Sequence, residues 1–170
     1  IFMEKLTSLF AHKVICISRS LRDFAIKEKI LKKNKTLVIH NGSSNGIDLS
    51  LFNPNEEIYH KVKRELQQKF DFKNKFVFGF LGRIVDDKGI NELFEVFCEL
   101  YEENNQVRLF LVGPFEMSQV TNKNLINQIN QHPGIINYGR VKQEEVPGFM
   151  LTMDIFVLPS HFEGLGMVLI

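Results

Sequence analysis

The stretch KFVFGFLGRIVDDKGINELFEVFCELYEENNQVRLFLVG, residues 75–113, sets the fold class of the chain. It starts with an uninterrupted apolar run at Phe76–Leu81, as expected of a strand that is covered on both faces. Ile90–Glu103 follows with apolar residues at helical spacing, and Val107–Val112 is a second apolar run. Strand, helix and strand in this order predict a βαβ unit, whose two strands lie parallel in one sheet.

The same alternation continues on both sides of this unit. Downstream we expect a polar helix at Leu125–Gln131 and a strand at Ile135–Tyr138. A short helix at Glu144–Met153, with Pro147 in its first turn, and a strand at Asp154–Leu158 should follow. The residues from Met167 are expected to start a last helix. Upstream we expect two short strands, Val14–Ser18 and Thr36–His40, with a helix at Ser20–Lys33 between them. A further helix is expected to carry Ile58, Val62 and Leu66 on one face. The pattern predicts an α/β fold, a Rossmann-like parallel sheet with helices on both faces.

Between these two regions, Asn41 to Pro54 is rich in Gly, Ser and Asn, which is typical of a linker. We therefore expect residues 1–54 to be the tail of one domain plus the linker, and residues 55–170 to be a Rossmann-like domain. Because the chain opens on Ile1 and stops at Ile170 within an expected helix, we interpret this second domain as incomplete at its C-terminus.

The composition, with 44% hydrophobic and 24% charged residues, is that of a soluble globular protein. A net charge of +1 gives no support for nucleic-acid binding. We expect a cytoplasmic protein, because no signal peptide is recognisable and no apolar run approaches the roughly 20 residues of a membrane span. Cys16 and Cys98 lie among apolar residues, which predicts two buried thiols, and no metal-ligand spacing exists.

The loop from Gly82 to Gly89 follows the first apolar strand and precedes a helix. In open parallel sheets, ligands bind at the carboxyl ends of the strands. Arg83 and Lys88 place two cations there, beside a helix N-terminus that itself favours anions, so the loop is suited to a diphosphate. The alternative is that both cations pair with acids of the same region: Asp86, Asp87 or Glu92.

A second loop, Pro159 to Gly166, also lies between a strand and a helix. Its glycines, Gly164 and Gly166, would let backbone N–H groups approach a ligand closely. A carboxylate such as Glu163 is repelled by a diphosphate, so we expect it to bind neutral donors, of which sugar hydroxyls are the obvious candidates. The alternative is that Glu163 caps the following helix.

A third loop, Tyr138 to Val141, lies in the same layer as Gly113 to Glu116. Backbone groups in these loops are suited to contact the edge of a nucleobase, although the signal is weak when taken alone.

Two motifs together resemble glycosyltransferase family four, a large retaining family with the two-domain GT-B fold. The G-R-x-x-x-x-K-G motif occurs at Gly82–Gly89, and P-S-x-x-E-G-x-G occurs at Pro159–Gly166, about 80 residues later. A narrower likeness, to bacterial enzymes that build capsule, O-antigen or other lipid-linked glycans, lies in three stretches: Asn41–Asp48, Val85–Ile90 and Val112–Glu116. Those enzymes commonly use UDP-sugars.

The resemblance implies a role for each matching residue. Arg83 and Lys88 would hold the donor diphosphate next to Gly82, and Glu163 would bind the transferred sugar; these three side chains are the catalytic candidates. Backbone donors would come from Gly164, Leu165 and Gly166, and the base would lie against Arg140 and Val141. The implied reaction moves a sugar, with retention, from a nucleotide-diphosphate sugar to a glycan or polyprenyl-diphosphate-linked acceptor.

The resemblance also implies what this part of the enzyme does not contain. The family's second glutamate, eight positions after the first, would fall at position 171, and the acceptor domain would precede Ile1. We therefore expect no turnover from these 170 residues alone. We expect no cofactor and no metal, because two cations can replace Mg²⁺. We interpret all five histidines as structural or solvent-facing: His12, His40, His60, His132 and His161.

Three further alternatives stay open at this point. The basic stretch of Lys27, Lys29, Lys32, Lys33 and Lys35 is either a contact to anionic lipid at the inner face of the membrane or a solvated helix face. A nucleotide-sugar epimerase or phosphorylase would share the fold. A non-enzymatic nucleotide-binding module would share it too, and there the loss of Arg83 or Lys88 would leave the cellular role intact.

Overall fold

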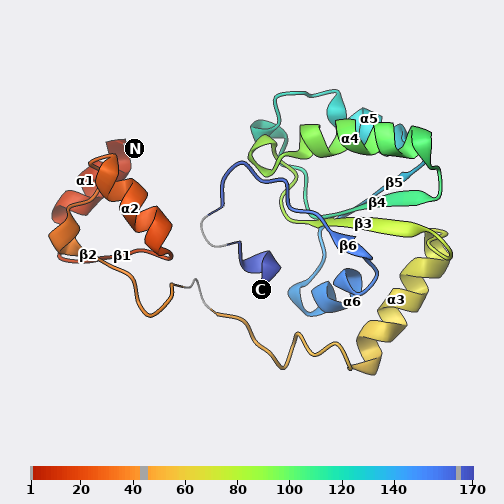
Figure 1. The fold of residues 1–170 in the computed structure, drawn as a ribbon, viewed down its shortest axis with the longest axis horizontal. Helices are drawn as coiled ribbons and strands as arrows, with labels where there is room; N and C mark the ends of the chain where they lie inside the picture. The colour runs from red at the N-terminus through yellow and green to blue at the C-terminus, as the bar shows by residue number, and fades with distance from the viewer. Residues whose placement is uncertain (1, 43–45, 164–165) are drawn as a thin grey trace. The chain divides into compact units, whose positions relative to one another are not determined.

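The computed structural model describes residues 2–42, 46–163 and 166–170. The chain forms two compact units (Figure 1): unit 1 takes its described residues from Ile1–Ile47 and Glu163–Ile170, and unit 2 is Asp48–Phe162. The domain boundary near Pro54 stays a prediction.

Unit 2 contains a four-stranded sheet in which all strands are parallel. Its order is β5-β4-β3-β6, with these bounds: β3 Phe76–Leu81, β4 Val107–Val112, β5 Ile135–Gly139 and β6 Ile155–Phe156. The register runs from Phe76 opposite Val107 to Leu81 opposite Val112. Because β3 and β4 end level with each other, the loops that follow them start side by side.

Helices α3 to α6 cover this sheet on both faces, as Figure 1 shows. Helices α4 (Ile90–Glu103) and α5 (Leu125–Gln131) lie on one face. Helices α3 (Glu57–Lys69) and α6 (Val146–Met150) lie on the other. Three short 3₁₀ segments connect the elements: η2 Asp86–Lys88, η3 Met117–Gln119 and η4 Gln143–Glu145.

Strand β4 contributes to the hydrophobic core on both faces of the sheet. Leu109 and Leu111 are fully buried in the cluster formed with α4 and α5. Phe110 and Val112 belong to the second cluster, with Leu66 of α3 and Phe149 of α6. Successive side chains of a strand point to opposite faces, so an uninterrupted apolar run fits only a sheet covered on both sides. The predicted parallel sheet with helices on both faces is confirmed.

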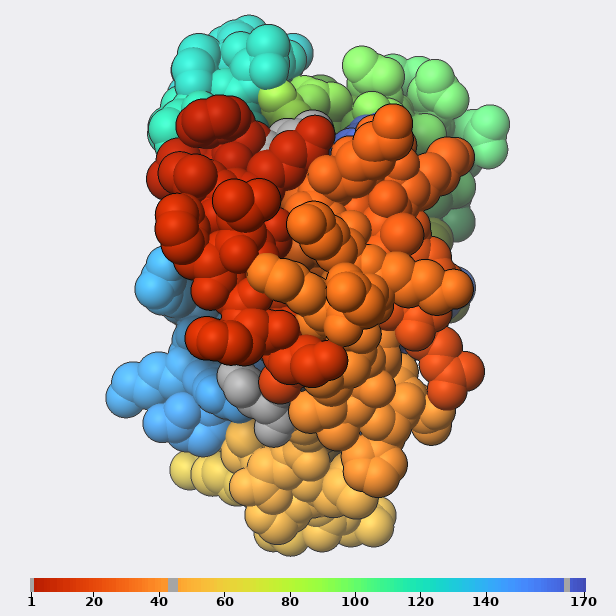
Figure 2. Space-filling model, turned by 90° about the vertical axis from the view of Figure 1, so that its left-hand side faces the viewer, coloured from red at the N-terminus to blue at the C-terminus, as the bar shows by residue number. Residues whose placement is uncertain are grey.

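Unit 1 is small and consists of short elements. They are α1 Phe2–Phe10, β1 Val14–Ile15, α2 Arg19–Lys27, η1 Lys33–Lys35, β2 Thr36–Leu37 and η5 Met167–Leu169. Strands β1 and β2 pair in parallel. In Figure 2 the red side chains of the first helix lie next to the orange side chains of the residues that follow. None of the helices in the described ranges is both long and apolar enough to cross a membrane.

The predicted helix at Ser20–Lys33 is wrong at its C-terminal end, since α2 stops at Lys27. The N–H of Lys29 bonds to the carbonyl of Ile26 at 3.0 Å, and that of Ile30 to Ala25 at 2.8 Å. Lys29 has a φ of 55°, so these contacts form a Schellman cap. This cap usually contains Gly, and a lysine at the left-handed position gives no sequence signal.

The prediction for α3 placed the wrong residue on the buried face. Ile58 is 57% exposed, whereas Tyr59 is 7% exposed and its hydroxyl donates to the carbonyl of Leu51 at 2.6 Å. The expected helix at Glu144–Met153 is in fact η4 followed by α6, with Pro147 in the first turn of α6 as predicted. Cys16 is buried, but Cys98 is only partly buried, so the second half of the thiol prediction is wrong.

Several other elements are shorter than predicted. The strands expected at Val14–Ser18, Thr36–His40 and Asp154–Leu158 are only two residues long each. The residues from Met167 form a 3₁₀ turn. An apolar run shows where a strand lies, but its ends depend on how far the neighbouring strand reaches.

Lys35 caps a helix, so it does not belong to a free basic surface. Its Nζ donates to the carbonyls of Leu9 at 2.9 Å and Ala11 at 2.8 Å, at the C-terminal end of α1. A cation stabilises the partial negative charge at this end of a helix. One of the five lysines in the basic stretch, Lys35, is therefore not available to contact anionic lipid.

Replacing Lys35 by methionine is expected to lower the free energy of unfolding by about 1–2 kcal/mol, because hydrogen bonds from a charged donor are lost. Urea denaturation of the full-length protein measures this. Lys33→Met removes a lysine that is exposed in the same 3₁₀ segment, and it should change the stability by less than about 0.5 kcal/mol. Equal losses for both variants would contradict the capping role.

Candidate functional site

The loops after β3, β4 and β5 meet at one edge of the sheet of unit 2. The N–H of Gly82 bonds to the carbonyl of Val112 at 2.9 Å, and the N–H of Gly113 bonds to the carbonyl of Gly139 at 2.8 Å. A Cβ on Gly113, which has a φ of 144°, would lie 1.8 Å from the carbonyl oxygen of Gly82. The backbones therefore approach each other more closely than a side chain allows.

A cavity of about 320 Å³ opens at this edge. It brings together residues of the first and third predicted loops, including Arg83 and Arg140. The full lining is Leu81, Gly82, Arg83, Val112, Gly113, Pro114, Arg140, Val141 and Val146. Four of the predicted site residues thus share one cavity: Gly82, Arg83, Arg140 and Val141. Lys88 is not among the residues that line it.

Arg83 forms an ion pair with the loop that follows the neighbouring strand. Its Nη1 lies 3.0 Å from Oε2 of Glu116, and the Arg83 side chain is 52% exposed. The sequence had offered Asp86, Asp87 or Glu92 as ion-pair partners, and for Arg83 that alternative is wrong. The register of β3 and β4 explains why, since it places the loop containing Glu116 directly beside the loop containing Arg83.

Asp86 connects the first loop to the chain beyond η3. Its carboxylate accepts hydrogen bonds from the N–H of Thr121 at 2.7 Å and from the side-chain amide of Asn91 at 2.9 Å. The hydrogen bonding from Thr121 is the main cause that holds the pKa of Asp86 below its usual value, with a smaller contribution from Asn91. Asp86 therefore stabilises the loop that contains Arg83 and Lys88, and it is not available to pair with Arg83.

The start of the second motif lies against the end of the first. The N–H of His161 donates to the carbonyl of Asp87 at 3.0 Å, and its Nε2 lies 3.1 Å from Oε1 of Glu92. Gly89 has a φ of 68°, and a Cβ on it would lie 2.2 Å from the carbonyl oxygen of Pro159. These contacts place Pro159–His161 beside η2, which contains Lys88.

The remaining residues of the second motif are not placed against this cavity. Glu163 belongs to unit 1, whereas the cavity belongs to unit 2. Gly164 and Leu165 lie outside the described residues. Gly166 has a φ of 60° and precedes η5. The roles of Lys88 and of Glu163 to Gly166 stay predictions.

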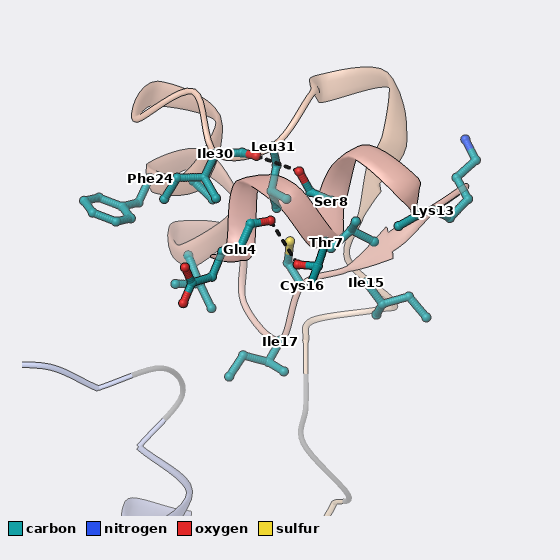
Figure 3. Close-up of a pocket in the computed structure, with 14 residues that line it drawn as sticks. Glu4, Thr7, Ser8, Lys13, Ile15, Cys16, Ile17, Phe24, Ile30 and Leu31 are labelled. Carbon is teal, nitrogen blue, oxygen red and sulfur yellow. Dashed lines mark hydrogen bonds between the residues drawn. The ribbon is translucent and has the colours of Figure 1, made fainter. Parts of the chain in front are cut away.

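A larger cavity of about 640 Å³ lies within unit 1 (Figure 3). Its lining is mostly apolar, with Ile15, Phe24 and Leu31 among its side chains, and the hydroxyl of Ser8 donates across it to the carbonyl of Ile30 at 3.0 Å. Burial raises the pKa of the Cys16 thiol in this cavity, which makes the sulfur less reactive. Because the cavity at the strand ends of unit 2 is lined by Arg83 and Arg140, it is a better candidate for binding an anion than this mostly apolar cavity of unit 1.

Within the described ranges, no group of three or more His, Cys, Asp and Glu side chains is arranged to hold a metal ion. His132 packs against the rings of Phe97 and Tyr101, and burial lowers its pKa. This agrees with a structural role for that histidine. Independence from metal stays a prediction.

Glu116 is a candidate functional residue that the sequence did not indicate. In the sequence it is only the last member of a loop, because nothing in the order of residues joins positions 83 and 116. The available signal was the predicted parallel pairing of the strands before the two loops, which places their first residues at the same edge of the sheet.

A parallel sheet whose strand ends surround an arginine-lined cavity defines this protein as an α/β protein with a cavity at the carboxyl edge of the sheet that is suited to an anionic ligand. Residues 62–170 match the family described as glycosyl transferases group 1. The match covers well over half of the chain, so the chain belongs to this family. The predicted resemblance to the GT-B glycosyltransferases is thereby confirmed.

Several curated relatives match nearly the whole chain, among them the following two. The capsular polysaccharide biosynthesis glycosyltransferase CapM of Staphylococcus aureus is 35% identical over 98% of this chain. A UDP-Gal:alpha-D-GlcNAc-diphosphoundecaprenol alpha-1,3-galactosyltransferase of Escherichia coli is 28% identical over 100% of it. The chain spans only 42% and 41% of the length of these relatives.

Among solved structures, the Anabaena protein HepE in complex with UDP and glucose superposes with a TM-score of 0.76 and 25% identity. That match covers 98% of this chain and 43% of the other. WaaG, a glycosyltransferase involved in lipopolysaccharide biosynthesis, superposes with a TM-score of 0.64 over 92% of this chain and 40% of the other. At 18% identity the likeness to WaaG shows the fold alone.

Proposed function

We propose that the full-length protein is a retaining hexosyltransferase that uses a UDP-sugar. Its acceptor would be a glycan or a polyprenyl-diphosphate-linked glycan in bacterial surface polysaccharide synthesis. The observation that carries this proposal is the cavity at the carboxyl edge of the sheet, which contains Arg83 and Arg140, in a chain of this family. The names of CapM and of the galactosyltransferase support the pathway and the acceptor, and the HepE complex supports UDP as the nucleotide.

In this proposal the protein acts mainly through electrostatics. Arg83 and Lys88 stabilise the negative charge that grows on the diphosphate as the bond to the sugar breaks, an effect typically worth several kcal/mol. Two fixed cations take the place of Mg²⁺, so the reaction is independent of metal. Arg140 and Val141 lie against the base, and Glu163 binds hydroxyls of the transferred sugar, with Gly164 to Gly166 presenting backbone donors. The protein works in the cytoplasm, next to the membrane that holds the acceptor.

A thermal-shift panel of UDP-, GDP- and ADP-sugars on the full-length protein, with and without Mg²⁺, tests the proposal. A ligand at a hundred times its Kd stabilises a protein by about 2.7 kcal/mol. For domains of this size that corresponds to an upward shift in Tm of several degrees. We expect this shift for UDP-sugars, and we expect it to be unchanged by Mg²⁺.

A larger shift with GDP- or ADP-sugars would contradict the choice of base, and a shift that requires Mg²⁺ would contradict metal independence. If none of the nucleotide sugars raised the Tm, the result would contradict the proposed function. Release of an altered sugar without acceptor would instead support the epimerase alternative.

A further inference from the structure

Glu116 is held in place by contacts on two sides. Its Oε2 lies 3.0 Å from Nη1 of Arg83, and the same oxygen accepts a hydrogen bond of 2.6 Å from the side-chain amide of Gln119. The N–H of Gln119 also donates to the backbone carbonyl of Glu116 at 2.8 Å. The Glu116 side chain is 29% exposed, so the carboxylate is partly shielded from water.

The backbones of the two loops are joined next to this ion pair. The N–H of Ile84 donates to the carbonyl of Pro114 at 2.9 Å, and Ile84 forms a parallel bridge with Phe115. Ile84 is fully buried. Glu116 therefore stays within reach of Arg83, because neither loop can move away without breaking these contacts.

The ion pair lies at the border of the cavity. Arg83 lines the cavity, whereas Glu116 is not among its lining residues, so the carboxylate holds the guanidinium from outside. An anion that enters the cavity has to compete with this carboxylate for Arg83. Arg140 lines the same cavity and is exposed, and the described part of the chain contains no ion pair of Arg140.

We propose that Glu116 is an internal counterion of Arg83 that weakens the binding of nucleoside diphosphates, so that this carboxylate sets the affinity for donor and product. This inference rests on the proposed function. The physical reason is that the carboxylate neutralises Arg83 in the empty site and repels a diphosphate in the occupied one. Weaker binding of the product also favours its release, which limits turnover in many enzymes.

Calorimetric titration of UDP into the full-length protein tests this proposal with Glu116→Gln, which keeps the shape of the side chain and removes its charge. We expect UDP to bind about three- to fivefold more tightly, as for the loss of one partly exposed ion pair. The KM of the UDP-sugar should fall by the same factor, and kcat should not rise. A purely structural role of Glu116 would not produce tighter binding.

A double-mutant cycle makes the test specific. Arg83→Met alone should weaken UDP binding by about ten- to a hundredfold. In that background Glu116→Gln should change the Kd by less than about twofold. Glu57→Gln is the matched control, because Glu57 is an exposed carboxylate that pairs with Arg64 at 2.5 Å on α3, and it should leave UDP binding unchanged.

The outcomes distinguish a failure of the counterion role of Glu116 from a failure of the proposed function. Absence of UDP binding by the unchanged protein, or binding that Arg83→Met does not weaken, overturns the proposed function itself. If Arg83→Met weakens binding while Glu116→Gln leaves it unchanged or weakens it, the function stands and the counterion role is wrong. Glu116→Ala provides a second variant and should shift the Kd in the same direction as Glu116→Gln.

Discussion

Arg83→Met in the full-length protein should lower kcat for the UDP-sugar by about a hundred- to a thousandfold. Removal of one preorganised donor from a site where negative charge develops typically has this effect. Methionine keeps the length of the apolar stem, so the main change is the loss of the guanidinium that lines the cavity. Initial-rate kinetics, with the concentration of the donor varied at saturating acceptor, measure the effect.

The matched control for this experiment is Arg64→Met. Arg64 is also an exposed arginine paired with a carboxylate, but it lies on α3 and does not line the cavity. It should leave kcat within about twofold, since exposed ion pairs contribute about 0–1 kcal/mol. If Arg83→Met retained more than about a third of kcat, Arg83 would not stabilise the leaving diphosphate.

Gly113→Ala should be the most destabilising single change at the edge of the sheet. The new Cβ would lie 1.8 Å from the carbonyl oxygen of Gly82, and this neighbour is backbone, which cannot rotate away. The left-handed backbone costs about 1–2 kcal/mol for a residue with a side chain. Overpacking adds about 1–3 kcal/mol, so we expect a loss of about 2–5 kcal/mol in the free energy of unfolding. Urea denaturation measures this loss.

Gly139→Ala separates the two effects in Gly113→Ala. Gly139 is the last residue of β5 and has a φ of 89°, yet apart from Gly139 and its two chain neighbours no atom of the described residues lies within 4 Å of the position that its Cβ would take. Gly139→Ala should lower the free energy of unfolding only by the cost of the left-handed backbone, about 1–2 kcal/mol. We expect Gly113→Ala also to remove the stabilisation by UDP-sugar, because Gly82 and Gly113 both line the cavity. Equal losses of stability in the two variants would show that the close approach of the loops is not required.

The βαβ unit at the centre of unit 2 could be predicted almost to the residue. The strand at Phe76–Leu81, the helix at Ile90–Glu103 and the strand at Val107–Val112 have the bounds that the sequence predicted. Each is long, and its hydrophobic pattern is uninterrupted, so local preference and burial agree. The first and third loops contribute to one cavity, because parallel strands bring their carboxyl ends to one edge.

The predictions for α2 and α3 that proved wrong concern features that the sequence pattern within each helix indicates only weakly. The end of α2 depends on a left-handed Lys29, which the sequence does not indicate. The buried face of α3 depends on Tyr59, whose hydroxyl reaches the carbonyl of Leu51 while its ring is buried. In both cases a contact to residues outside the helix overrides the periodicity within it.

The sequence by itself therefore determined the parallel sheet, its covering helices and the edge at which cations collect. These follow from hydrophobic periodicity and from glycines between strand and helix, which are local properties of the chain. Only the tertiary structure decided which acid neutralises Arg83 and which loops share a cavity. The reason is that Glu116 lies far from Arg83 along the chain, and the parallel pairing of β3 and β4 places the two loops side by side, where the charges lie 3.0 Å apart.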